Sequence, residues 1–344
     1  MPLLSIISQQ SVSMVEGGPL TQLRETARHL PAYGWEVEYF DQWKRFDPER
    51  YDAVHIFGAS FLTYDTARRL VHFGVPYVVS PIFFSNRSPR MIRMVRRASR
   101  LITRRLGVVR TDYDFTAEVC RDARFVLPNT SDEGRLIREG LGVAPERIRV
   151  IPNGVDPRFA EASPDLFERE YGLKDFVLNV GHIGSGRKNV LRLMQAMRGV
   201  DADLVVIGKI HQGSYADACM REAATNPRIH IIEGLPNDSP MLASAYAACR
   251  VFALPSIFET PGIAALEAAV AGAGIVITPY GGTRDYFAED AVYVEPESTE
   301  SIRSGLLRAL AQGQPTGLGK RIAEQYAWKR VAEMTAEIYG EMQN

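Results

Sequence analysis

Cysteine is scarce in this sequence, and the placement of its few cysteines excludes two classes of structure. Among 344 residues there are three, Cys120, Cys219 and Cys249, far apart and with no C-x-x-C pair. Disulfide frameworks and structural zinc sites need cysteines in matched or closely spaced pairs. We therefore expect free thiols and a reducing, cytoplasmic setting.

Long apolar runs and an excess of basic charge are also missing. A membrane-spanning helix needs about 18 or more apolar residues in succession, and no stretch is that long. The opening MPLLSIISQQ has no basic start and reads as a first strand, not as a signal peptide. A net charge of −1 argues against a general nucleic-acid binder, so we expect a soluble protein with no nucleic-acid partner.

What the chain does have is a regular alternation of short apolar strands and helical patterns. Strands such as AVHIF (53–57) in the first half are matched by FVLNVG (176–181) and GIVITP (274–279) in the second. This alternation predicts βαβ units and parallel sheets. The length suits two domains, with a boundary near the polar, Pro- and Gly-containing segment 153–165.

The segment 251–287 carries the most information about chemistry. It reads as a buried strand, a loop, a helix and a second strand, with Thr260 placed to cap the helix and Pro261 at its first position. The unpaired N–H groups and positive dipole end of a helix start bind phosphate. The expected donors are the N–H groups of Gly262, Ile263 and Ala264.

Two carboxylates, Glu259 and Glu267, accompany this helix start, with seven residues between them. Acids beside a diphosphate are poor phosphate ligands, so we expect them to accept hydrogen bonds from sugar hydroxyls. Glu267 lies among apolar neighbours on a helix that is apolar all round, which predicts that it is buried and needs a partner. The alternative is an exposed helical acid.

A glycine-rich turn after the strand at 176–181 carries Arg187 and Lys188. Small residues let the backbone approach a phosphate closely, and a cation neutralises the charge that grows on a leaving diphosphate. The alternative is a solvated basic turn before a helix. Together with the paired acids, the turn predicts a nucleotide-sugar site.

These segments resemble the retaining glycosyltransferases of family 4. ETPGIAALE (259–267), followed by Gly281-Gly282, is similar to their E-x7-E region. Other segments match in the same order, namely VEGG (15–18), YDAVHIF (51–57), VLPNTSDEGRLIREGLGVAPERIRVIPNGVD (126–156), NVGHIGSGRKN (179–189), IIEGLPN (231–237) and YAWKRVAEMTAEIY (326–339). A lone E-x7-E spacing would be weak evidence for this family. The full set of segments, in the same order and covering nearly the whole chain, is strong evidence for the resemblance.

The resemblance implies an α/β protein with the GT-B fold, in which two Rossmann-like domains face a central cleft. Residues 1–158 would form the acceptor-binding domain and residues 159–321 the donor-binding domain. The last helix, within 322–344, would cross back to the N-terminal domain.

The resemblance also implies roles for individual residues. Glu267 would bind the ribose and Glu259 the donor sugar, while Lys188 and Arg187 would stabilise the departing diphosphate. His182 stands where the family usually has arginine and would give a weaker, pH-dependent contact.

Four further residues have an expected role and a plain alternative. Leu235 would present backbone to the nucleobase, or is a core leucine at a strand end. Gly17 and Gly18 would approach donor phosphate or acceptor, or form an ordinary strand–helix turn. His55, in the D-x-V-H strand, would contact the acceptor or is structural. Members of the family often carry another histidine at the place that Ile82 or Phe83 occupies in this chain.

Residues 87–110 contain nine arginines and no acid. At 100° per residue an amphipathic helix is predicted, with Arg90, Arg93, Arg97, Arg100 and Arg104 on one face and Met91, Met94, Val95, Ala98, Leu101 and Ile102 opposite. In one interpretation the apolar face packs on the protein's own sheet and the arginines are solvated. In the others the arginines contact an anionic membrane surface or a phosphate-bearing acceptor.

Asp201-Ala202-Asp203 matches a D-x-D metal motif superficially, but it precedes a strand, so we interpret it as a polar turn and expect neither metal nor other cofactor.

The expected function is metal-independent transfer of a sugar from a UDP- or GDP-sugar to a glycan or lipid-linked glycan, with retention, as in polysaccharide biosynthesis. The protein would be cytoplasmic or peripheral at the inner face of the cell membrane. The alternatives are a nucleotide-sugar isomerase or epimerase, and a non-catalytic subunit that binds a glycan or nucleotide-sugar.

Overall fold

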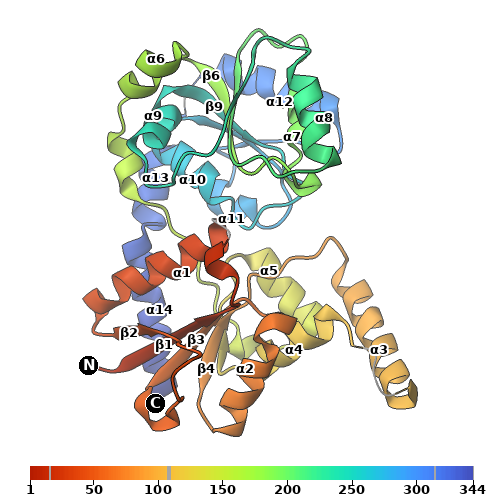
Figure 1. The fold of residues 1–344 in the computed structure, drawn as a ribbon, viewed down its shortest axis with the longest axis vertical. Coiled ribbons are helices and arrows are strands. Elements are labelled where there is room, and N and C mark those ends of the chain that lie inside the picture. Colours follow the sequence, from red (N-terminus) through yellow and green to blue (C-terminus); the bar gives the residue numbers. More distant parts are fainter. Residues whose placement is uncertain (15–16, 107–109, 314, 344) are drawn as a thin grey trace. The chain divides into compact units, whose positions relative to one another are not determined.

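The computed structural model describes residues 1–14, 17–106, 110–313 and 315–343. The chain folds as two compact units (Figure 1). Unit 1 comprises Met1–Gly154 and Trp328–Asn344, and unit 2 comprises Val155–Ala327. The chain therefore passes between the units at 154/155 and at 327/328, where the sequence analysis placed the boundaries at 158/159 and 321/322.

Unit 1 is built on a five-stranded parallel sheet with the order β2-β1-β3-β4-β5. Its central strands β3 and β4 are buried along their whole lengths, as parallel strands are when both faces are covered. The strands are β1 (Leu3–Ser8), β2 (Glu36–Tyr39), β3 (Ala53–Phe57), β4 (Tyr77–Ser80) and β5 (Phe125–Val126). The order reverses between β1 and β3.

The helices of unit 1 include one from the far end of the chain. They are α1 (Gly18–His29), α2 (Phe61–His72), α3 (Pro89–Leu106), α4 (Asp112–Asp122), α5 (Ser131–Arg135) and α14 (Trp328–Gln343). The ring of Trp328 lies so close to Gly154 that a Cβ there would be 2.4 Å from it. The predicted return of the last helix to the N-terminal sheet is confirmed, whereas α13 (Leu318–Gln325) packs in the core of unit 2.

Unit 2 contains a six-stranded parallel sheet with the order β11-β10-β9-β6-β7-β8. Counted within the unit this is 6-5-4-1-2-3, the Rossmann order, whose reversal lies between β6 and β9. The strands are β6 (Phe176–Val180), β7 (Leu204–Ile207), β8 (Ile229–Ile232), β9 (Cys249–Leu254), β10 (Gly274–Ile277) and β11 (Val292–Tyr293). The helices besides α13 are α6 (Asp165–Tyr171), α7 (Val190–Ala196), α8 (Ser214–Ala223), α9 (Pro240–Ala248), α10 (Ile263–Val270), α11 (Thr283–Phe287) and α12 (Thr299–Gln312).

Both faces of this second sheet are buried, and alternate residues of each strand point to opposite faces. Phe176 and Leu178 of β6 join one apolar cluster with α9, α10 and α13, while Val177 joins a second cluster with α7, α8 and α12. The predicted alternation of strands and helices around parallel sheets is confirmed in both units. Among the described residues, no helix combines the length and the apolar character needed to cross a membrane.

Candidate active site in the second unit

The loops after β6 and β9 flank the point where the strand order of unit 2 reverses. In open parallel sheets the crevice beyond the carboxyl ends of the strands at this point is the usual ligand site. The loop after β6 contains Arg187 and Lys188, and the loop after β9 contains Glu259. The fold therefore brings together three residues that the sequence analysis singled out separately.

One backbone hydrogen bond and one side-chain hydrogen bond hold these two loops against each other. The Ile257 N–H donates to the Arg187 carbonyl at 2.8 Å, and the Asn189 side-chain amide donates to the Pro255 carbonyl at 2.9 Å. Asn189 adopts a left-handed φ of +58°, which asparagine tolerates better than most residues. Ser185 opens the turn at 186–188 by accepting a hydrogen bond from the Arg187 N–H.

Glu259 is buried and meets both cations of the turn. Its Oε1 lies 2.7 Å from Lys188 Nζ and 3.3 Å from Arg187 Nη1. Burial alone would raise the pKa of the Glu259 carboxyl, but the charges of Lys188 and Arg187 outweigh it and hold that pKa below its ordinary value. Glu259 is therefore ionised at neutral pH, and the three side chains together carry one net positive charge.

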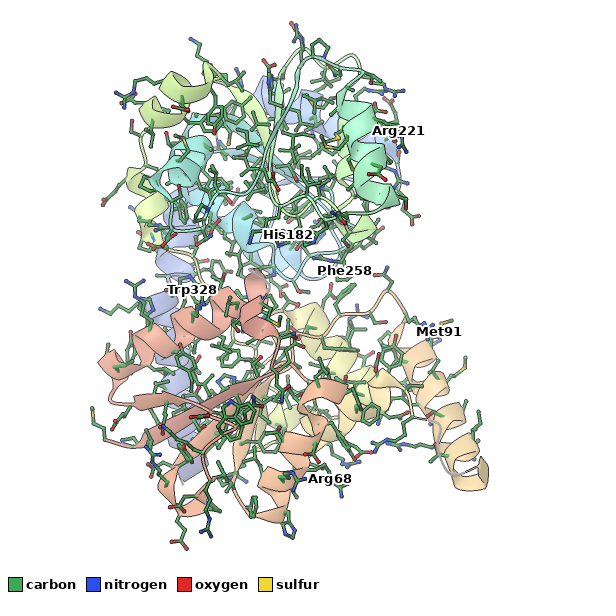
Figure 2. All side chains as sticks on the ribbon, in the orientation of Figure 1. Arg68, Met91, His182, Arg221, Phe258 and Trp328 are labelled. Atoms are coloured by element: carbon green, nitrogen blue, oxygen red, sulfur yellow. The ribbon has the colours of Figure 1, made fainter. Side chains whose placement is uncertain are left out.

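Arg187 makes two further contacts to the loop after β9. Its Nη1 lies 3.1 Å from the Phe258 carbonyl, and its guanidinium stands 5.1 Å from the centre of the Phe258 ring. Figure 2 labels Phe258 among the side chains of unit 2. The Arg187 side chain nevertheless remains 38% exposed, so part of the guanidinium is open to a ligand.

A glycine behind Glu259 makes this arrangement possible. Gly281 has a φ of +99°, and a Cβ there would lie 2.2 Å from the Glu259 carbonyl oxygen. The Glu259 N–H donates to the Tyr280 carbonyl at 3.0 Å, which pins the loop after β9 to the turn after β10. The predicted Gly281-Gly282 turn thus supports the backbone of Glu259, which carries the carboxylate.

The start of α10 differs from the sequence prediction. The helix begins at Ile263, and its cap is Gly262 with a left-handed φ of +86°, not Thr260. Pro261, expected at the first helical position, precedes the cap, and its bond to Thr260 is cis. The predicted cap was wrong because Gly262, which follows Pro261, has a left-handed and therefore non-helical backbone, so the helix can begin only after it. The first N–H groups of α10, including those of Ile263 and Ala264, still lack acceptors within the helix.

Glu267 is the fifth residue of α10, little more than one turn from the loop, and it is buried, as its apolar neighbours predicted. Asn237 Nδ2 donates to its Oε1 at 2.9 Å and the Tyr246 hydroxyl donates to its Oε2 at 2.8 Å. Burial raises the pKa of Glu267, and these two hydrogen bonds only partly offset the rise. The sequence analysis missed both partners, because nothing in the spacing of Asn237 or Tyr246 marks them.

The remaining predicted donor residues of unit 2 lie on neighbouring loops. His182, which is labelled in Figure 2, follows β6, and its ring packs edge-on against His211 with 5.1 Å between the ring centres. Leu235 follows β8 and packs partly buried against the core, in line with its alternative as a core leucine. The loops after β6 and β7 touch, since a Cβ on Gly208 would lie 1.9 Å from the Gly181 carbonyl oxygen.

Two of the predicted residues of unit 1 lie at the start of α1. Gly17 precedes α1, and its carbonyl accepts the Thr21 N–H at 3.1 Å. Gly18 is the first residue of α1. The other two positions of the VEGG motif, Val15 and Glu16, lie outside the described residues.

His55 is a structural residue. It is 1% exposed, with Nδ1 2.6 Å from the Tyr339 hydroxyl and Nε2 3.0 Å from the Ser80 hydroxyl. Burial lowers the pKa of its imidazole to about 3, so the ring is neutral. With both nitrogens engaged in the interior, His55 presents no ring nitrogen to an acceptor, and the structure contradicts that expectation.

A buried acid that the sequence analysis missed lies in unit 1. Glu133 accepts hydrogen bonds from the backbone N–H groups of Phe83 and Asn129, both at 2.7 Å. Burial raises the pKa of Glu133 to about 7, although both hydrogen bonds favour the ionised form. The pattern Thr130-x-x-Glu133 is a helix-capping signature that could have drawn attention to it, and Thr130 does cap α5.

Two protein-family models match this chain. The one described as "Glycosyl transferases group 1" matches residues 167–325, and the one described as "Glycosyl transferase 4-like domain" matches residues 13–154. The first covers most of unit 2 and the second most of unit 1.

Curated relatives are similar over about two thirds of the chain. MMP alpha-(1->4)-mannosyltransferase from Mycolicibacterium hassiacum is 26% identical over 253 residues, which cover 68% of this chain and 59% of that protein. D-inositol 3-phosphate glycosyltransferase from Geodermatophilus obscurus is 26% identical over 240 residues, which cover 64% and 53%. The chain thus spans somewhat over half the length of these relatives.

Solved structures share the fold along the whole chain. Sucrose-phosphate synthase from Thermosynechococcus elongatus has a TM-score of 0.78 at 17% identity, covering 99% of both chains. HepE of Anabaena, solved in complex with UDP-glucose, has a TM-score of 0.74 at 14% identity and covers 99% of this chain and 100% of its own. These likenesses confirm the predicted GT-B fold.

Proposed function

The chain belongs to the group 1 glycosyltransferases, which resemble family 4 and have the GT-B fold. We therefore propose that it transfers a sugar from a nucleoside diphosphate sugar to an acceptor hydroxyl. The observation that carries this proposal is the cluster of Lys188, Arg187 and Glu259 at the strand-order reversal of unit 2. Its net positive charge suits a diphosphate, and its buried acid suits the hydroxyls of a sugar.

In the proposed complex the diphosphate lies against Lys188, Arg187 and the N–H groups at the start of α10. Glu259 would then accept hydrogen bonds from the transferred sugar, and Glu267 from the ribose. The backbone near Leu235 would contact a uracil or guanine base, with His182 and the glycines Gly17 and Gly18 as further phosphate contacts. A relative of the same fold, HepE, was solved with UDP-glucose, which supports a donor of this class.

We propose transfer with retention of configuration and without a metal ion. The acceptor oxygen would attack the anomeric carbon on the face that the diphosphate leaves, the carbon–oxygen bond to the diphosphate would break, and the diphosphate would take the acceptor's proton. Lys188 and Arg187 would stabilise the departing negative charge, a task that a metal ion performs in other enzymes. Asp201 and Asp203, the D-x-D residues, instead pair with Arg228 and His230.

The acceptor in this proposal is a hydroxyl of a glycan or lipid-linked glycan. The mannosyltransferase and the D-inositol 3-phosphate glycosyltransferase among the relatives support a sugar or polyol acceptor in general. A lipid-linked acceptor would require the protein to work at a membrane surface, as a peripheral protein.

The first test is a thermal-shift screen with UDP, GDP, ADP and their sugars, followed by calorimetric titration of the best ligand. We expect Glu267→Ala to weaken donor binding by roughly tenfold, because one buried hydrogen-bonding acceptor is lost. Glu222→Ala is the matched control, since Glu222 is a buried glutamate of α8 in unit 2 that pairs with Arg198. Wild-type affinity in Glu267→Ala would remove the ribose role.

Turnover assays separate the candidate activities. A transferase consumes donor in proportion to acceptor and is unaffected by EDTA. Conversion of a nucleotide-sugar into its isomer with no acceptor present would identify an isomerase instead. Binding without turnover, with every acceptor tried, would leave a non-catalytic binding subunit.

A further inference from the structure

Helix α3 has three different faces. The face that packs against the rest of unit 1 is mostly polar, and the other two are basic and apolar. Ile92, Arg96 and Ser99 are buried. Because successive helical residues turn by about 100°, these three share one side of the helix. The centre of the face formed by Arg90, Arg93, Arg97 and Arg100 lies about 120° to one side of it. The apolar side chains centred on Ala98 lie about 120° to the other side.

A buried polar network fixes the orientation of the helix. Arg96 is 8% exposed, and its guanidinium donates to the Leu141 carbonyl and faces Asp114 at 3.6 Å. The Ser99 hydroxyl donates to the same Asp114 carboxylate at 2.7 Å. Ile92 fills the space beside Gly140, where a Cβ would lie 3.3 Å from its side chain. These contacts prevent α3 from rolling its apolar side inward.

The apolar face is consequently left on the surface, contrary to the expectation that it packs on the sheet of unit 1. Met94 and Leu101 are 61% and 62% exposed, and Met91 and Ile102 are 46% and 40% exposed. Within the described part of the chain nothing covers them, and Figure 1 shows α3 standing off from the sheet of unit 1. Met91 is labelled on this helix in Figure 2.

The basic face lies directly beside the apolar one. Arg90, Arg97 and Arg100 are exposed, and none of them pairs with a carboxylate of the described residues, while Arg93 is exposed and donates to the Glu139 carbonyl at 2.6 Å. No Asp or Glu occurs between residues 87 and 110. The side chains of Arg104 and Arg105 lie outside the described residues.

We propose that α3 lies in the surface of an anionic lipid bilayer, with Met91, Met94, Leu101 and Ile102 in the acyl region and the neighbouring arginines at the headgroups. A bilayer surface offers an apolar layer and an anionic layer side by side, which is the order of the two exposed faces. A second copy of the chain would place arginines against arginines. A polyanion in solution would leave the apolar face in water.

The proposal is independent of sugar transfer, so it is tested by binding alone. The full chain is sedimented with vesicles of phosphatidylcholine, or of phosphatidylcholine with phosphatidylglycerol, at low and at high salt. We expect binding to the anionic vesicles only, and weaker binding at high salt. Arg90→Gln/Arg97→Gln/Arg100→Gln should lower the partition coefficient by about fivefold per arginine, and Met94→Ser/Leu101→Ser by roughly tenfold or more.

The matched control is Leu307→Ser/Arg308→Gln, because these neighbours are exposed on α12 of unit 2 and have the same chemistry. It should bind as the wild type does. An environment-sensitive fluorophore on Met94→Cys should shift to the blue with anionic vesicles, whereas the same label on Leu307→Cys should not. The three native cysteines are buried, which favours labelling at the new site.

Three outcomes would overturn the proposal. Wild-type protein that stays in solution with anionic vesicles at low salt would leave the apolar face to a protein partner. Binding unchanged by the arginine variant would assign it to another surface. Binding unchanged by Met94→Ser/Leu101→Ser, with no fluorescence shift at position 94, would rule out insertion.

Discussion

Glu259 is a carboxylate that the fold keeps both buried and ionised. Burial disfavours the charge, and two cations restore it, with Lys188 Nζ closest at 2.7 Å. Glu267, eight positions along the chain, has only neutral hydrogen-bond donors and a raised pKa. Two glutamates of one motif therefore differ in charge behaviour because of their partners and not because of their depth.

The pairing of Lys188 with Glu259 can be measured by a double-mutant cycle. We expect Lys188→Met to lower the free energy of unfolding by about 2–3 kcal/mol, because it leaves a buried carboxylate without its closest cation. Lys188→Met/Glu259→Gln should recover much of that loss in urea unfolding, with a coupling of about 1–3 kcal/mol. Both variants should lose transferase turnover by about 10²-fold or more. Strictly additive losses of stability would show that the pair is not coupled.

Glu133 should make the stability of unit 1 depend on pH. Its pKa is raised from 4.5 to about 7, so between these values the folded protein binds more protons than the unfolded chain. Stability attributable to this group is therefore fully present below pH 4.5 and is lost as pH rises to about 7. In urea unfolding from pH 4.5 to 8, the wild type should lose roughly 3 kcal/mol relative to Glu133→Gln. Parallel curves for the two proteins would contradict this expectation.

At the scale of elements, the site depends on loops that follow non-adjacent strands in the sequence. The loops after β6 and β9 meet because those strands pair in the sheet, and the turn after β10 supports Glu259 from behind. Strand order thus decides which loops become neighbours, and glycines decide how closely their backbones approach.

Gly281→Ala tests this support. A Cβ at position 281 would meet the Glu259 backbone at 2.2 Å, so we expect a loss of about 3 kcal/mol in stability together with weaker donor binding. Gly199→Ala is the control, because Gly199 also has a positive φ, +81°, but a Cβ there meets open space. It should cost only about 1 kcal/mol. Equal effects would show that φ, and not the clash, limits position 281.

Helix α3 shows where periodicity fails as a guide to packing. An apolar stripe normally faces the core, yet here Arg96, Ser99 and Asp114 form the attachment and the stripe stays outside. Spacing along a helix determines which residues share a side. It does not determine which side the rest of the protein covers.

At the scale of the whole molecule, α14 belongs to unit 1 although it follows unit 2 in the chain. Its attachment includes the contact of Tyr339 with His55 on β3 and the edge-on packing of Tyr339 against Trp35 at 5.0 Å. The N-terminal unit therefore cannot be completed until the end of the chain has been added.

Tyr339→Phe should destabilise unit 1 alone. It leaves a nitrogen of the buried His55 without its partner, at a cost of about 1–3 kcal/mol. Hydrogen exchange measured by mass spectrometry should quicken within residues 1–154 and not within 155–327. Tyr246→Phe, which removes a buried hydroxyl that bonds Glu267 in unit 2, should give the reverse pattern. Faster exchange in both units with either variant would mean that they unfold together.

Local patterns in the sequence were enough to predict the layers of this protein and to mark the charged side chains of its candidate site. Alternating apolar strands and helices require buried parallel sheets, and an acid such as Glu267 on a wholly apolar helix must be buried with a partner. These conclusions follow from local patterns, because burial of backbone and of charge constrains residues wherever they fold.

Which of those residues come into contact depends on the tertiary fold. The pairing of β6 with β9 brought Lys188 to Glu259, and the left-handed Gly262 moved the start of α10 past Pro261. His55 is an interior residue because α14 covers it through Tyr339, 284 positions along the chain. Contacts between distant segments depend on strand order and backbone direction, and neither is encoded in the spacing of residues along the chain.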